Sequence, residues 1–142
     1  KSLAYKYSHR VTILAPSVAV IVSLLLIPLS KVLHIFFDVD ASILVQSAGM
    51  LKILMLYYPF KAFNMTMIVG VCRSGGDTVF SAIADTVFMY LFAIPLASYV
   101  AFNLGAPAML IFACLNTDDL WKFATLLWRL LSKKWLHNVT EN

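Results

Sequence analysis

Residues 69–78 read VGVCRSGGDT and form a charged, glycine-bearing turn between two long apolar stretches. The stretch before it, 43–72, contains two charged residues, and the stretch after it, 79–102, contains one. A helix needs about 20 mostly apolar residues to cross a bilayer, and both stretches are longer than that. Gly75 and Gly76 permit backbone angles that other residues resist, so the turn can be tight. The pattern predicts that one membrane helix ends here and the next begins.

The composition of the whole chain indicates an all-α, multi-pass membrane protein. Of its 142 residues, 61% are hydrophobic and 13% are charged, and the mean hydropathy is +0.85. A soluble domain normally has about a quarter of its residues charged. We predict four transmembrane helices at roughly 11–30, 43–72, 78–102 and 106–131, followed by a tail at 132–142.

The first and third connections between these helices carry their own boundary signals. The first, at about 31–42, contains four titratable residues, namely Lys31, His34, Asp38 and Asp40. Asp40 also offers a side chain that can cap the second helix. In the third connection Gly105 suits the end of one helix and Pro107 suits the start of the next.

The lysines and arginines predict the orientation of the chain in the membrane. One side receives seven of them, and the opposite side receives only Lys31. The seven are Lys1, Lys6, Arg10, Arg73, Arg129, Lys133 and Lys134. By the positive-inside rule we expect both termini and the turn at 73–77 to be cytoplasmic, in a plasma-membrane protein. The net charge of +4 then reflects topology and contact with the lipid bilayer, and no nucleic-acid partner is expected.

The chain begins at Lys1 and not at a methionine. We therefore expect a fragment of a longer protein, with 1–10 forming the loop after a preceding span. Enzyme motifs are absent from the sequence, which has no phosphate-binding loop and no Ser/His/Asp set. Cys72 and Cys114 lie within predicted spans without a histidine cluster, so we expect packing residues and no disulfide. No catalytic residue, metal site or cofactor is expected.

Five charged residues lie deep inside the predicted spans, where each costs about 2.5–3.5 kcal/mol on insertion scales. They are Lys61, Asp85, Asp118, Asp119 and Lys122. Such residues are retained where they pair with one another or face water, so all five are candidates for binding a coupling ion or substrate. Lys52 lies nearer the outer end of its span and can snorkel to the interface.

The fourth span brings acid and base onto one helix face. Asp118 and Lys122 are spaced i,i+4, and Asp119 and Lys122 are spaced i,i+3. One interpretation is an ion pair within the membrane that locks helices together. The other is that the excess carboxylate binds a coupling cation or a cationic substrate.

Lys61 lies two residues after Pro59, which can bend the second span, and Asn64 follows almost one turn later. Lys61 could neutralise Asp85 or an aspartate of the fourth span, or it could line a cavity. Asn64 joins the candidate residues because of this position.

An ordered set of motifs across nearly the whole chain resembles the end of a multidrug and toxic compound extrusion (MATE) transporter. The motifs are Gly70 to Thr78, Asp85, Ile94-Pro95-Leu96-Ala97, Asp118-Asp119-Leu120-Trp121-Lys122, and Arg129 with Lys133-Lys134-Trp135. The resemblance implies the last four of twelve helices, within a C-terminal lobe of six. It also implies export of organic cations or drugs in exchange for H⁺ or Na⁺. The partners would be the N-terminal lobe and the first two helices of the C-terminal lobe, without which the chain should not transport.

The resemblance also implies roles for individual residues. The cytoplasmic turn motif consists of Arg73, Gly75, Gly76 and Asp77. Asp85 would join Asp77 and Arg73 in a cluster that holds an inner gate, although a simple pair at a helix end is an equal alternative. Some family members carry an acidic cation ligand near Lys61, and this departure favours H⁺ over Na⁺.

Two other functions remain open on the sequence. A related lipid-precursor or polysaccharide flippase could use Lys52 and Lys61 to face an anionic substrate, which would require a cationic groove. A helical scaffold without transport is disfavoured because it has no evident need for charged residues inside its spans.

Overall fold

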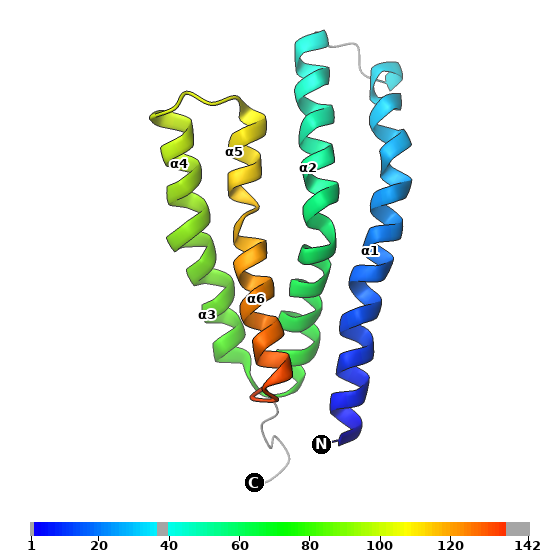
Figure 1. The fold of residues 1–142 in the computed structure, drawn as a ribbon, viewed down its shortest axis with the longest axis vertical. Coiled ribbons are helices and arrows are strands. Elements are labelled where there is room, and N and C mark those ends of the chain that lie inside the picture. The colour runs from blue at the N-terminus through cyan, green and yellow to red at the C-terminus, as the bar shows by residue number, and fades with distance from the viewer. Residues whose placement is uncertain (1, 37–39, 136–142) are drawn as a thin grey trace.

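The computed structural model describes residues 2–36 and 40–135, which form a bundle of antiparallel helices (Figure 1). The helices are α1 (Ser2–Phe36), α2 (Ala41–Met65), η1 (Thr66–Cys72), α3 (Thr78–Phe88), η2 (Met89–Ala93), α4 (Ile94–Phe102), α5 (Ala108–Leu115) and α6 (Asp118–Leu131). The two η segments are π-helical and continue α2 and α3 without a break in the chain direction. Three stretches of the described chain are long and apolar enough to cross a membrane: Tyr5–Pro28, Ala41–Cys72 and Thr78–Phe102.

The first helix is longer than expected at both ends. It begins at Ser2, so the loop predicted at 1–10 is wrong for the residues that the structure describes there. It also continues to Phe36, which places Lys31 and His34 in the helix and not in a connection. Neither extension contains Gly or Pro, so nothing in the local sequence ends the helix where the apolar run ends. Asp38 lies outside the described residues.

The second and third spans lie where they were expected, and the residues between them form the tight turn. Gly76 has φ 83°, a left-handed conformation that suits glycine. Gly75 is buried against the ring and carbonyl of Trp135, where a Cβ atom would clash. At the other end of the second span, Asp40 occupies the N-cap position of α2, but its side chain makes no capping hydrogen bond.

The fourth span is broken into two helices, unlike the continuous helix expected at 106–131. α5 ends at Leu115 and α6 begins at Asp118. At the break Asn116 Nδ2 donates a hydrogen bond to the carbonyl of Phe112 (2.8 Å), and Thr117 Oγ1 donates one to the carbonyl of Cys114. These side chains bond to the local backbone and compete with helix continuation, which explains the interruption.

The best-packed part of the bundle lies toward the turn at 75–77. Its buried core joins α2, η1, α6 and the residues after α6, and consists of Phe63, Met67, Ile68, Val71, Cys72, Leu126, Leu130 and Trp135. Cys72 and Cys114 are free thiols. The core fixes α6 against α2, and this contact positions the charged residues described next.

Candidate functional site

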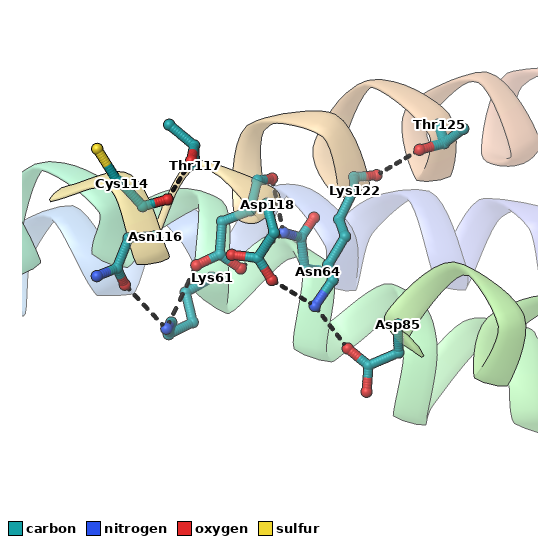
Figure 2. Close-up of polar contacts among 10 residues, drawn as sticks. Lys61, Asn64, Asp85, Cys114, Asn116, Thr117, Asp118, Lys122 and Thr125 are labelled. Carbon is teal, nitrogen blue, oxygen red and sulfur yellow. Dashed lines mark hydrogen bonds and ion pairs between the residues drawn. The ribbon is translucent and has the colours of Figure 1, made fainter. Parts of the chain in front are cut away.

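Charged and amide side chains gather where α2 and α3 meet the break between α5 and α6 (Figure 2). We call this group the ionic cluster. It consists of Lys61 and Asn64 from α2, Asp85 from α3, Asn116 from the break, and Asp118, Asp119 and Lys122 from α6. The break matters because it places the first turn of α6, with its two carboxylates, inside the bundle.

Lys122 is the ammonium at one end of the cluster. Its Nζ lies 2.8 Å from Oδ2 of Asp118 on the same helix and 2.8 Å from Oδ1 of Asp85 on α3. The side chains of Lys122 and Asp118 are only 8% and 11% exposed, whereas that of Asp85 is 58% exposed. Lys122 therefore ties α6 to α3 through one buried and one exposed carboxylate.

Lys61 serves the other end. Its Nζ lies 3.3 Å from Oδ2 of Asp119 and donates a hydrogen bond of 3.3 Å to Oδ1 of Asn116. Asn64 Nδ2 donates to the backbone carbonyl of Asp119 (2.9 Å) and to its Oδ1 (3.2 Å). The Asp119 carboxylate is thus buried between a lysine that is 45% exposed and an amide that is buried.

The cluster carries an excess negative charge. With all groups ionised, its three carboxylates outnumber its two ammoniums by one. Asp118 and Asp119 also occupy the first turn of α6, where the positive end of the helix dipole favours carboxylates. Asn64 Oδ1 is buried and has no hydrogen-bond partner among the described residues. The net negative charge of the cluster can therefore attract a cation. When no cation is bound, each buried carboxylate still has an ammonium as its partner.

Several sequence predictions can be compared with this geometry. The i,i+4 pair of Asp118 and Lys122 is present, and Lys61 pairs with an aspartate of the fourth span, as one alternative proposed. Asp119 was expected to share Lys122, but it pairs with Lys61, because its position one residue later turns it toward α2. For Asp85 the resemblance implied a cluster with Asp77 and Arg73, with a simple pair at a helix end as an equal alternative; the structure instead pairs Asp85 with Lys122 of α6.

The turn forms a separate ion pair near the opposite end of α6. Oδ2 of Asp77 accepts a hydrogen bond of 2.7 Å from Nε of Arg129, whose guanidinium lies 4.3 Å from the centre of the Phe80 ring. Arg73 is exposed. Asp85 lies about two turns further along α3 from Asp77, at the level of Lys122, and this is why it joins the ionic cluster.

Two residues were missed by the sequence reasoning. Asn116 was not predicted to break the helix or to accept a hydrogen bond from Lys61. The signal was available, because Asn116-Thr117 directly before two acidic residues is typical of a helix start. Arg129 was assigned to topology and to the family resemblance, but its ion pair with Asp77 was not predicted. Among the described residues no group of three or more His, Cys, Asp or Glu could hold a metal ion.

Comparison with known proteins adds a family assignment. The family model MatE matches residues 1–100, which run from the start of the chain into α4. No curated protein and no solved structure matches the chain. The match covers Lys61, Asn64 and Asp85 but ends before α6. Because it spans more than half of the sequence, the chain belongs to the MatE family of multidrug and toxic compound efflux transporters.

Proposed function

We propose that this chain is part of a cation-coupled antiporter that exports organic cations, and that the ionic cluster takes part in coupling. The observation that carries the proposal is a cluster of three carboxylates and two ammoniums at a broken helix, in which Asp118, Asp119 and Lys122 are buried. Ionisable residues inside a membrane bundle typically mark ion or substrate pathways. Broken helices whose ends point at charged groups are a recurrent feature of transporter sites.

We propose H⁺ as the coupling ion in preference to Na⁺. Each buried carboxylate already has an ammonium within 3.3 Å, Lys61 at Asp119 and Lys122 at Asp118. A sodium ion would have to enter beside these positive charges, whereas a proton can bind to a carboxylate after its lysine moves away. The exposed side chain of Lys61 is the more easily displaced of the two.

The charge balance also bears on the flippase alternative. That function requires a cationic groove that uses Lys52 and Lys61. Lys61 is paired with Asp119 in a cluster that is negative as a whole, and Lys52 lies apart from it in a groove that is otherwise mostly apolar. Export of a cation is therefore better supported than movement of an anionic lipid precursor.

We further propose that the chain lies in the plasma membrane with both termini and the turn cytoplasmic, and works with the other helices that complete a two-lobed transporter. The start of α1, the turn at 75–77 and the end of α6 lie at one end of the bundle (Figure 1), which supports a common side for their basic residues.

The test is ethidium efflux from energised vesicles that contain the whole transporter, under an imposed H⁺ or Na⁺ gradient. We compare wild type with Asp118→Asn and Asp119→Asn, and use Asp40→Asn as a matched control because Asp40 is exposed and its side chain caps nothing. We expect H⁺-driven efflux to be lost in at least one cluster variant and kept in the control. Unchanged efflux in both cluster variants would reduce the cluster to a structural role, and efflux driven only by Na⁺ would refute H⁺ coupling. A wild type without any efflux would favour the flippase.

A further inference from the structure

A continuous apolar groove runs along the seam between α1 and α2, away from the ionic cluster. Two cavities of about 410 and 390 Å³ form it, and Val20 and Pro59 line both. One cavity reaches from this shared point to Phe63, and the other reaches from it to Lys52. The two therefore form one elongated groove that opens on the side of the bundle.

The length of the groove matches one leaflet of a bilayer. Lys52 and Phe63 mark its two ends on α2, and at 1.5 Å of rise per residue they are about 16 Å apart along the helix axis. The hydrocarbon core of a bilayer is about 30 Å thick, so each leaflet contributes about 15 Å. An acyl chain lying along the seam would span the groove from end to end.

The polar groups of the groove differ between its two ends. Near Phe63, Thr12 and Ser17 line the groove, but their hydroxyls already donate to the carbonyls of Ser8 (2.6 Å) and Ile13 (2.8 Å). Toward Lys52, the Ser23 hydroxyl has no hydrogen-bond partner among the residues that the structure describes, although Ser23 is only 7% exposed.

Among the described residues, Lys52 is the one charged residue lining either cavity, and it forms no ion pair with any of them. Within the described part of the chain, a buried hydroxyl without a partner and an exposed ammonium without a counter-ion thus lie at the same end of an apolar groove. This combination complements a molecule with an anionic head, a hydrogen-bond acceptor near it and a long apolar tail.

We propose that the α1–α2 groove binds one anionic phospholipid of the leaflet nearest the α1–α2 connection. The phosphate pairs with Lys52, the Ser23 hydroxyl donates to an ester carbonyl, and one acyl chain lies along the groove past Val20 and Pro59. The proposed lipid site shares no residue with the ionic cluster, so it does not rest on the proposed role of that cluster in coupling.

The experiment measures lipid retained by the whole transporter, purified in neutral detergent and mixed with equal amounts of phosphatidylglycerol and phosphatidylcholine. Native mass spectrometry counts the bound molecules. We expect wild type to retain phosphatidylglycerol preferentially and Lys52→Gln to reduce that preference about fivefold, the effect of one basic residue near an anionic surface. Ser23→Ala should weaken retention of both lipids.

Matched variants test whether lipid retention depends on the groove itself or on any bulky or charge-removing substitution. Val20→Phe should fill the groove and abolish retention of both lipids, whereas Val18→Phe, exposed but outside both cavities, should not. Lys6→Gln removes one exposed charge elsewhere and should keep the preference. Equal retention by Lys52→Gln and wild type would overturn the proposal, as would a wild type that retains neither lipid because other helices cover the groove. Displacement of phosphatidylglycerol by oleate at equal concentration would show that the groove selects a free fatty acid instead.

Discussion

Removing the Lys122 ammonium should destabilise the bundle strongly, and the structure gives the expected size of the effect. In Lys122→Met the side-chain volume is nearly kept, but Asp118 loses its only ion-pair partner among the described residues while staying 11% exposed. Breaking a buried pair in this way costs about 3–5 kcal/mol. Asp85 is 58% exposed, so the loss of its contact adds at most about 1 kcal/mol.

The second half of the prediction is a rescue. In the double variant Lys122→Met/Asp118→Asn no lone carboxylate remains buried in this pair, so about 2 kcal/mol of the loss should return. Asp85→Asn alone should cost no more than about 1 kcal/mol, because Lys122 keeps Asp118.

The assay is reversible unfolding in mixed micelles with increasing dodecyl sulfate, followed by circular dichroism on the whole transporter. Lys6→Met serves as control for loss of an exposed lysine. The reasoning is refuted if Lys122→Met costs less than about 1 kcal/mol, or if the two substitutions at 118 and 122 are simply additive.

Two further substitutions test the turn at Gly75 and the hydrogen bonds from Asn64 to Asp119 by the same unfolding assay. Gly75→Ala should lower the free energy of unfolding by about 1–3 kcal/mol, because the added Cβ would clash with Trp135. Gly70→Ala is the control: the nearest atom to its added Cβ is 3.9 Å away, so the substitution should be neutral or slightly stabilising. Equal effects at both positions would contradict the packing argument. Asn64→Ala should lower the free energy of unfolding by about 1.5–3 kcal/mol, because it removes two hydrogen bonds to Asp119. The loss should be smaller when Asp119 is already replaced by Asn. An equal loss in the Asp119→Asn background would show that the bond to the carboxylate contributes nothing.

Features governed by neighbouring residues were readable from the sequence. The turn around Gly75 and Gly76 and the connection around Gly105 were expected where they occur, because glycine acts through its own backbone freedom. The pair of Asp118 and Lys122 was also readable, since a spacing of i,i+4 places both on one face of any helix.

Features that depend on how helices pack were not readable. From the sequence, Asp85 could pair either with the turn or with α6. It pairs with Lys122 because the packing of α3 beside α6 brings these two residues to the same level along the bundle axis. The break at Asn116 and Thr117 was hidden by the strongly apolar run of α5 before it, which favours a continuous span on composition alone. The family resemblance predicted from the sequence is confirmed by the family model that matches residues 1–100.

The divided fourth crossing has a consequence for how the protein enters the membrane during synthesis. α5 spans about 12 Å, less than half of the hydrocarbon core, and so cannot anchor the crossing by itself. α6 carries four charged residues, Asp118, Asp119, Lys122 and Arg129. The first three are buried, and each opposes insertion by about 2.5–3.5 kcal/mol at the centre of a span. Asp118 pairs with Lys122 on α6 itself, whereas Asp119 and Lys122 also pair with Lys61 on α2 and Asp85 on α3, which are translated before α6. Lys61 and Asp85 are thus synthesised before the α6 charges with which they pair. We therefore expect membrane insertion of the last crossing to depend on the helices before it.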